Sequence, residues 1–217
     1  MTLLIGIMAD SHGQPETIKA VLAALSNLAC RTVYHLGDVC DSAHPETAEV
    51  CLRLLQEQHV IMIKGNNDHA IIANNIDRRC PFAAPEVWRY LRAAPLIQFY
   101  QNAVFTHSLP FADTLGLSSM IGTLGENEAL RSFNEFPHHI VFRGHSHSPE
   151  IVQPRGRGVT SHSLGPGEKV DLAGRIPSVV TCGALTRGLY MVWNPADNSI
   201  KSLALPSYAI PPKRGNE

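Results

Sequence analysis

The feature that most constrains the fold is an apolar run over residues 3–9 that stops abruptly at Asp10. A run without polar alternation is typical of a strand buried on both faces of a sheet. Two further segments of this kind, 32–36 and 60–64, follow along the chain. The segments between them, 15–28 and 46–58, carry apolar residues at helical spacing. Strands that alternate with helices predict βαβ units and parallel strands.

The rest of the chain predicts more strands than helices. We expect helices over 86–93 and 126–133, a hairpin of 96–100 and 103–106, an irregular segment over 108–124, a strand at 140–143, a loop or hairpin over 154–170, and closing strands at 179–181, 189–193 and 200–205. Two runs of strands with helices outside them predict an α/β protein. No change in composition marks a boundary, so we expect one domain over 1–206 and a frayed tail over 207–217.

Composition argues against several classes of protein. The 18 Lys+Arg and 19 Asp+Glu give a formal charge of −1, so no electrostatic case exists for binding nucleic acid or an anionic membrane. No segment approaches the ~20 apolar residues that span a bilayer. The first apolar run has no basic flank and makes a poor signal peptide, so we expect a cytoplasmic protein.

The five cysteines, without a CxxC pair, are expected to be reduced and mostly buried. The apolar residues between 111 and 121 predict a covering loop or a subunit contact, so an oligomer is compatible with the sequence.

Residue types that bind metals follow five predicted strands where each strand ends. They are Asp10-Ser11-His12, Gly37-Asp38, Gly65-Asn66-Asn67-Asp68, Thr106-His107 and Gly144-His145-Ser146-His147. Sites in parallel sheets assemble beyond the carboxyl ends of the strands. In an extended segment, side chains two apart point the same way, so Asp10 with His12 should aim at one spot. The same argument applies to His145 with His147.

Each of these residues also has an ordinary structural interpretation. Asp10 and Asp38 could be turn or capping residues, Asn66-Asn67 could be a left-handed turn, and His107 could be a histidine of the core. The glycines at 37, 65 and 144 fit a tight exit from a strand in either case. The coincidence of all five motifs favours a shared site, with two aspartates, one asparagine and four histidines. Seven ligands suit two metals that share a carboxylate.

The order DxH, GD, GNxD, H and GHxH resembles the calcineurin-like metallophosphoesterase superfamily, and the stretch from Gly37 to Gly65-Asn66 resembles its small bacterial and archaeal phosphodiesterase branch. The resemblance implies a four-layer α+β sandwich, in which two facing mixed β-sheets are flanked by helices. It further implies that Asp10, His12 and His147 hold one divalent metal, that Asn66, His107 and His145 hold a second, and that Asp38 bridges them. Manganese or iron suits these ligands, with zinc, nickel or cobalt as alternatives.

The activity implied is hydrolysis of a small phosphate ester, either a phosphodiester or an activated phosphomonoester, with a metal-bridging hydroxide as the nucleophile. Free N–H groups at Gly13 and Gln14, before the first helix, could face a phosphate oxygen. Arg143 and Arg187 are interpreted as solvated arginines, with a phosphate contact as the alternative.

Two departures from the superfamily pattern bear on catalysis. Asn67 stands where many members have a histidine that is thought to protonate the leaving oxygen, so Asn67 is our candidate catalytic position. An amide cannot serve as an acid, and general acid catalysis contributes ~10²–10⁴-fold, so alkyl leaving groups should react more slowly than acidic ones. Ser108 follows His107 where glycine is usual, which could change the backbone beside the second metal.

Two other functions remain as alternatives. A protein phosphatase or a dinucleoside-polyphosphate hydrolase shares the motifs, but Ser42 replaces the phosphate-binding arginine of the GDxxDRG motif of protein phosphatases. A non-catalytic protein-binding scaffold of the same fold should have lost metal ligands, and all seven are present here.

Overall fold

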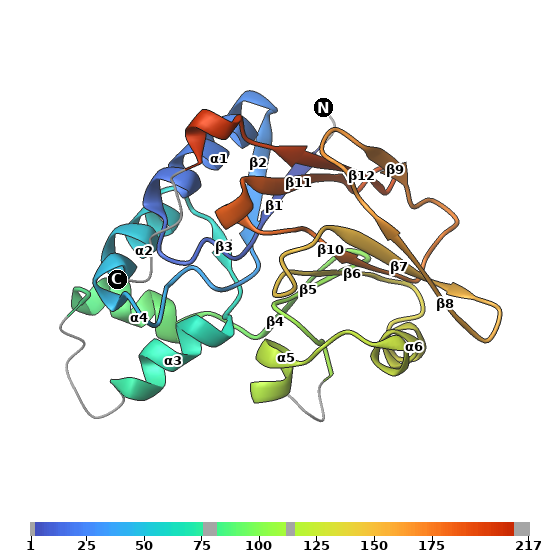
Figure 1. The fold of residues 1–217 in the computed structure, drawn as a ribbon, viewed down its shortest axis with the longest axis horizontal. Helices are drawn as coiled ribbons and strands as arrows, with labels where there is room; N and C mark the ends of the chain where they lie inside the picture. Colours follow the sequence, from blue (N-terminus) through green and yellow to red (C-terminus); the bar gives the residue numbers. More distant parts are fainter. Residues whose placement is uncertain (1–2, 76–81, 112–115, 211–217) are drawn as a thin grey trace.

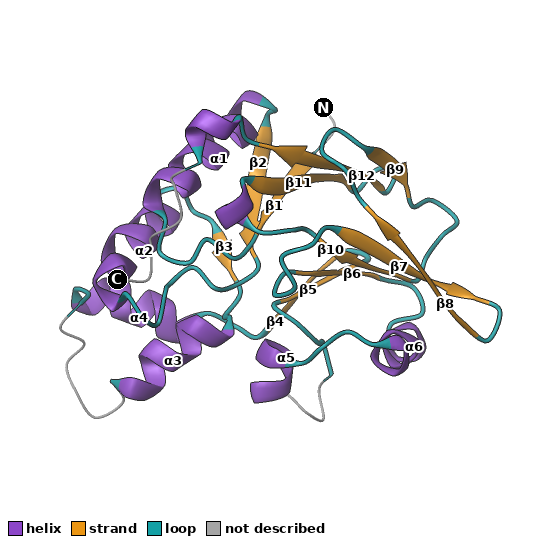
Figure 2. Cartoon of the chain, viewed as in Figure 1, coloured by secondary structure: helices purple, strands orange, loops and turns teal. Residues whose placement is uncertain are grey.

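Two six-stranded sheets face each other across a shared apolar core, and helices cover their outer faces (Figures 1 and 2). The computed structural model describes residues 3–75, 82–111 and 116–210. Ile5, Phe105 and Trp193 are fully buried between the sheets. The layers therefore follow the order helix, sheet, sheet, helix, and the predicted α/β sandwich is confirmed.

The first sheet combines a parallel half with an antiparallel half. Its strands are β1 (Leu4–Met8), β2 (Cys30–His35), β3 (Ile61–Met62), β9 (Lys169–Asp171), β11 (Leu189–Asn194) and β12 (Ser199–Ala204), in the order β3-β2-β1-β11-β12-β9. β1, β2 and β3 run parallel, as the strand–helix alternation predicts. β11 pairs antiparallel with β1 and begins the second half of the sheet.

The second sheet is also mixed. Its strands are β4 (Ile97–Tyr100), β5 (Ala103–Thr106), β6 (Ile140–Arg143), β7 (Glu150–Arg155), β8 (Gly158–Ser163) and β10 (Ser178–Thr181), in the order β4-β5-β6-β10-β7-β8. β5, β6 and β10 run parallel, whereas β4–β5 and β7–β8 form antiparallel hairpins. The carboxyl ends of β5 and β6 therefore lie at one edge of this sheet.

Six helices and three short turns are described outside the sheets. They are α1 (Pro15–Asn27), α2 (Ala48–Glu57), α3 (Asn66–Asn74), α4 (Pro85–Ala93), α5 (Leu117–Ile121) and α6 (Glu126–Glu135), with short 3-10 turns η1 (Pro45–Thr47), η3 (Leu185–Arg187) and η4 (Ser207–Ala209). α1, α2 and α6 pack on the outer faces through apolar residues. α1 and α2 bury Ile18, Leu25 and Leu52 in the cluster on the first sheet. α6 packs Phe133 against Val141 of the second sheet. None of the helices in the described ranges is long and apolar enough to cross a membrane.

The structure adds elements that the sequence pattern did not predict. α3 begins directly at the Gly65-Asn66 motif, where we expected only a strand end, because this asparagine-rich helix has no apolar stripe. α5 forms within the segment expected to be irregular. The predicted tail starts with η4, and residues 211–217 lie outside the described ranges. Cys30, Cys40, Cys51 and Cys182 are buried as expected, and Cys80 lies outside the described residues.

Candidate metal centre

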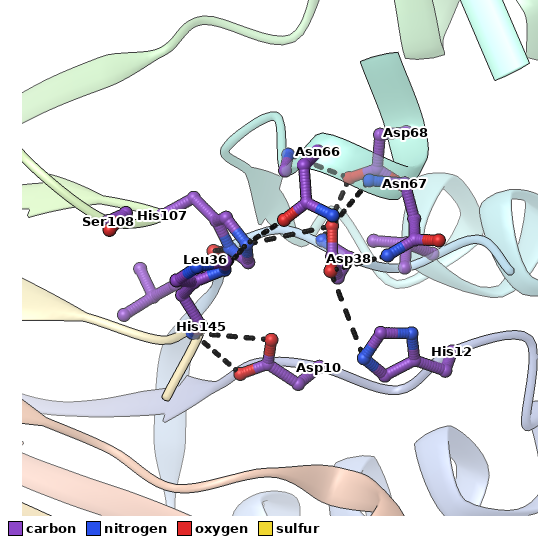
Figure 3. Close-up of polar contacts among 12 residues, drawn as sticks. Asp10, His12, Leu36, Asp38, Asn66, Asn67, Asp68, His107, Ser108 and His145 are labelled. Carbon is purple, nitrogen blue, oxygen red and sulfur yellow. Dashed lines mark hydrogen bonds and ion pairs between the residues drawn. The ribbon is translucent and has the colours of Figure 1, made fainter. Parts of the chain in front are cut away.

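All seven predicted ligands lie where strand ends of the two sheets meet. Figure 3 labels all of them except His147. Asp10 and His12 follow β1, Asp38 follows β2, Asn66 opens α3 after β3, His107 follows β5, and His145 and His147 follow β6. Two groups have ligand atoms within 4.8 Å of one another: Asp10 with His12 and His147, and Asp10 with Asp38 and His107. Either group could hold a metal ion.

Five of the predicted ligands have a left-handed backbone conformation, which is uncommon outside glycine. These are Asp10, His12, Asp38, His145 and His147, with φ from 42° at His12 to 67° at His145. Asp and His tolerate this region better than most residues. The expectation that strand alternation aims these pairs is therefore wrong, because the chain has already left the strand. Asp10 and His12 still converge on His147, but His145 turns away to His107.

Backbone hydrogen bonds hold the ligand loops together. Asp10 N–H donates to the carbonyl of Gly37 at 3.0 Å, and His12 N–H donates to that of Asp38 at 3.0 Å. Gly37 has a φ of +94°, and a Cβ there would lie 2.7 Å from His107 Nδ1. A Cβ at Gly65 would overlap the backbone nitrogen and carboxylate of Asp38. The close approach of the loops therefore requires glycine at both positions, as we expected.

One side of the centre is partly open to solvent. His12 Nε2 lies 3.2 Å from His147 Nε2, and His147 Nε2 lies 3.5 Å from Asp10 Oδ1. The side chains of His12 and His147 are 23% and 32% exposed, whereas Asp10 is fully buried. The backbone N–H of His145 donates a hydrogen bond to the Asp10 carboxylate and so holds it in place.

The other side is buried and is centred on His107. His107 Nδ1 lies 2.7 Å from the carbonyl oxygen of Leu36. Because a carbonyl only accepts, Nδ1 carries the proton, and the neutral ring presents a lone pair at Nε2. This Nε2 faces Nδ1 of His145 at 3.3 Å and Oδ1 of Asp38 at 3.6 Å. Acceptor atoms thus gather around one point, which is the arrangement that a cation needs.

The Asn66 amide completes this side, and its two orientations differ in whether they satisfy their neighbours. With its nitrogen toward the imidazoles it donates to His107 Nε2 at 3.1 Å, to His145 Nδ1 at 3.2 Å and to the Met120 carbonyl at 3.3 Å. With its oxygen toward the imidazoles it places another acceptor 3.1 Å from His107 Nε2. The second orientation is favourable only with a cation between these atoms. The residues therefore fit a divalent ion.

Protonation of the site follows from burial and from contacts between its members. Burial tends to raise the pKa of Asp10, but the hydrogen bond with His147 and the nearby imidazoles outweigh it and lower the pKa. The same hydrogen bond raises the pKa of His147. Burial, with the neighbouring His107, lowers the pKa of His145. A lowered pKa keeps His145 neutral near pH 7, as a ligand must be.

Comparisons with known proteins agree with this geometry. A family model described as the calcineurin-like phosphoesterase superfamily domain matches residues 3–183. The chain belongs to this superfamily. The resemblance inferred from the motifs is thereby confirmed, and hydrolase activity with divalent metals is the superfamily's characteristic chemistry.

Individual relatives are distant. Uncharacterized protein MJ0912 of Methanocaldococcus jannaschii is 22% identical over 174 residues, which are 70% of this chain and 66% of that protein, just under two thirds of its length. A metallophosphoesterase from Sphaerobacter thermophilus has a TM-score of 0.76 at 19% identity and covers 95% of this chain and 89% of its own. A structure described as a novel archaeal phosphodiesterase has a TM-score of 0.51 at 13% identity, covering 94% of this chain and 100% of its own. At these identities the solved structures show a shared fold.

Asn67, the first departure from the superfamily pattern, is tied to Asp38 on one side and to Ser42 on the other. Its Nδ2 donates to Asp38 Oδ2 at 2.8 Å, and its backbone N–H donates to Asp38 Oδ1 at 2.8 Å. Its Oδ1 accepts from the Ser42 hydroxyl at 2.7 Å. The amide therefore holds the carboxylate that faces both sides of the centre.

Asp68 is a site residue to which the sequence assigned no role. It is fully buried and accepts hydrogen bonds from the backbone N–H groups of Asp38, Cys40 and Gly65 at 2.9–3.0 Å. Burial, together with the nearby Asp38, raises its pKa, although the N–H donors oppose the rise. An acid three residues after a glycine that precedes a helix is a usable signal, because it can bond back to the start of the helix.

Ser108, the second departure, is tied to Arg143. Arg143 Nε donates to the Ser108 carbonyl at 3.0 Å, and its Nη2 and Nη1 donate to the hydroxyls of Ser108 and Thr181. The Ser108 hydroxyl also contacts the Gly122 carbonyl. Arg143 is 1% exposed, so both sequence interpretations of it, a solvated arginine and a phosphate contact, are wrong. It fastens the loop that carries His107.

The expected anion-binding N–H groups before α1 are also occupied. Gly13 N–H donates to the Val39 carbonyl at 2.9 Å, and Gln14 N–H donates to the Ser11 carbonyl at 3.0 Å. Neither is free to face a phosphate, so that expectation is wrong. His35 lies beneath this loop, fully buried, with Nε2 3.0 Å from the Ser11 hydroxyl.

Proposed function

We propose that this protein is a dinuclear metal-dependent phosphoesterase that hydrolyses phosphodiesters or activated phosphomonoesters. One observation carries the proposal: the two carboxylate oxygens of Asp38 face opposite sides of the centre. Oδ1 lies 3.6 Å from His107 Nε2, and Oδ2 lies 3.8 Å from His12 Nε2. Asp38 thus has the position of a bridging ligand between two groups of nitrogen and oxygen donors.

The proposed ligand sets are those that the superfamily resemblance implies. Asp10, His12 and His147 would hold one ion, Asn66, His107 and His145 would hold the other, and Asp38 would be shared. When bound, two divalent ions supply Lewis acidity toward phosphoryl oxygens and acidify a water to serve as the nucleophile. Manganese or iron suits this mixed set of nitrogen and oxygen donors, and metal availability decides among these and zinc, nickel or cobalt.

The chain's own residues would orient this chemistry. The floor, formed by Asp10, Asp38 and His107, is buried and keeps bulk water away from one face of the substrate. His12 and His147 leave the opposite side open for a phosphate ester to enter. Backbone hydrogen bonds already hold the loops of this floor in place. The loops therefore need little reorganisation when a phosphoryl group binds.

Asn67 bears on the choice of leaving group. Its amide is already engaged with Asp38 and Ser42, and an amide has no acidic proton at neutral pH. Substrates whose leaving group needs no protonation should therefore react best, which favours aryl esters and other activated esters. The check is to compare aryl and alkyl phosphodiesters in wild type and in Asn67→His. We expect the ratio of the aryl to the alkyl hydrolysis rate to be smaller in the variant than in wild type. The same ratio in both proteins would refute the proposed effect of Asn67 on the leaving group.

The enzyme hypothesis is tested by metal content and by hydrolysis of bis(p-nitrophenyl) phosphate with added manganese. We expect up to two metal ions per chain, and a loss of at least ~10³-fold in kcat/KM for Asp38→Asn and His145→Ala. His138→Ala, at an exposed histidine before β6, is the matched control and should behave as wild type. A wild-type protein that holds little metal and hydrolyses nothing would instead match the scaffold alternative.

A further inference from the structure

Arg187 borders the candidate metal centre at the end of η3. Its Nη1 lies 3.4 Å from the carbonyl oxygen of His147. The turn that carries it is fastened to the ligand loop, because Leu185 N–H donates to the Ala9 carbonyl at 2.8 Å and Thr186 N–H donates to the Asp10 carbonyl at 3.3 Å. The backbone therefore fixes Arg187 beside the metal centre, whatever the side chain contacts.

Arg187 lies on the side of the centre that a substrate can reach. His147, its neighbour, is among the partly exposed ligands, whereas Asp38 and His107 form the buried floor. Its Nη1 donates to the carbonyl oxygen of His147, so the guanidinium lies next to that ligand residue. A ligand above His12 and His147 would come within reach of this charge.

Arg187 is exposed, and no carboxylate in the described ranges forms an ion pair with it. Asn67 and Ser42, which contact each other beside Asp38, are neutral. Ser42 occupies the position where the protein-phosphatase motif has arginine. Neither of these two residues therefore offers a positive charge to an anionic ligand, whereas Arg187 does.

We propose that Arg187 binds a second anionic group of the substrate, a phosphate or a carboxylate outside the reacting phosphoryl group. The preferred substrate is then a phosphate ester that carries a further anion. A guanidinium suits this role, because it donates paired hydrogen bonds to phosphate and carboxylate oxygens and stays charged at any working pH. The inference rests on the phosphoesterase function proposed above.

The test uses two chromogenic esters that differ by one anion: the 5′-p-nitrophenyl esters of thymidine 5′-phosphate and of thymidine 3′,5′-bisphosphate. Wild type should have the lower KM for the bisphosphate ester. Arg187→Gln should raise that KM about tenfold with kcat unchanged, and should change the KM of the monophosphate ester less than about twofold. Arg187→Lys should have a KM between those of wild type and Arg187→Gln, because lysine restores the positive charge but not the paired hydrogen-bond donors of the guanidinium.

The matched control is Arg175→Gln, an exposed arginine at the opposite end of β10, which should leave both KM values unchanged. An Arg187→Gln variant that affects both esters equally, or neither, overturns the inference. Calorimetric binding of thymidine 3′,5′-bisphosphate and thymidine 5′-phosphate to the manganese-loaded protein separates the role of Arg187 in anion binding from the proposed phosphoesterase function. If wild type hydrolyses neither ester, the proposed function fails, and a tenfold weaker affinity of Arg187→Gln for the bisphosphate alone would still support Arg187.

Discussion

The two sheets contribute different chemistry to the metal centre. The first sheet supplies every oxygen ligand, from Asp10, Asp38 and Asn66, together with one imidazole. The second sheet supplies imidazoles alone, from His107, His145 and His147. Neither sheet holds a complete set for two ions. The centre is therefore a junction, and cations bound there would connect the two sheets.

The sheets also fasten their ligand loops with buried ions of opposite sign. In the first sheet, the carboxylate of Asp68 accepts N–H groups from the loop that carries Asp38. In the second, the guanidinium of Arg143 donates to oxygens of the loop that follows His107. Burial raises the pKa of Asp68 and lowers that of Arg143 to about 10. In both cases an ion that is costly to bury gains hydrogen bonds that fix the loop.

Metal removal should have the largest effect on this comparison, because it breaks the junction itself. Treatment with a chelator should abolish hydrolysis, and manganese should restore it. A metal present at 100 times its dissociation constant should add about 2.7 kcal/mol to the free energy of unfolding. The measurement is thermal unfolding with and without manganese. His145→Ala should show a smaller gain, and an equal gain in both proteins would mean that the metal binds elsewhere.

Replacing the buried anion should have the next largest effect. Asp68→Asn keeps the shape but turns a donor toward backbone N–H groups that need an acceptor, so we expect a loss of about 2–4 kcal/mol in the free energy of unfolding. Metal affinity should fall as well, since the loop of Asp38 loosens. Urea unfolding and metal titration measure the two effects. Glu57→Gln, at an exposed acid that ends α2, is the control.

Replacing the buried cation should cost less. Arg143→Met leaves the oxygens of Ser108 and Thr181 without their donor, but it also removes a charge from the interior. We expect the free energy of unfolding to fall by about 1–3 kcal/mol. Arg31→Met, at an exposed arginine of β2, should have little effect. A loss as large as that of Asp68→Asn would show that the two loops depend equally on their buried ion.

At pH 7 the smallest effect should come from His35, beneath the first sheet's loops, because its contribution changes only as the pH falls. Burial lowers its pKa from 6.5 to about 3, so between these values the unfolded chain binds a proton that the folded chain does not. Stability is therefore fully present above pH 6.5 and is lost as the pH falls toward 3, by up to ~1.4 kcal/mol per pH unit. Urea unfolding of the metal-free protein from pH 7 to pH 4.5 measures the slope. His35→Gln should flatten it, His138→Gln should not, and equal slopes in all three proteins would contradict the assignment.

The clustering of the seven candidate residues was predictable from the sequence, because each of them follows a local pattern, an apolar strand that ends in Asp, Asn or His. The parallel order of β1, β2 and β3 follows from the same pattern. The structure brings all seven residues together, and their roles as ligands remain proposals. The four-layer fold came from the superfamily resemblance, which the family model confirms.

What the sequence could not predict depends on contacts between distant segments. No local pattern distinguishes Arg143 from an exposed arginine at a strand end. Its hydrogen-bond partners lie in β10 and in the loop of Ser108, which only the fold brings to it. The N–H group of Gly13 looks free until the loop after β2 brings the Val39 carbonyl to it. α3 has no apolar stripe and gains stability from Asp68 and from the ligand loops. In each case the partner lies tens of residues away or outside the pattern that periodicity detects.

The left-handed backbone at Asp10, His12, Asp38, His145 and His147 limits how this site can evolve. Besides glycine, the residues that tolerate such positions best are asparagine, aspartate and histidine, which are themselves metal ligands. Substitutions tolerated at these positions should be mostly to residues that can still coordinate a cation or to glycine, rather than to alanine or branched side chains. Substitutions that keep the loop conformation are therefore mostly substitutions that keep a potential cation ligand.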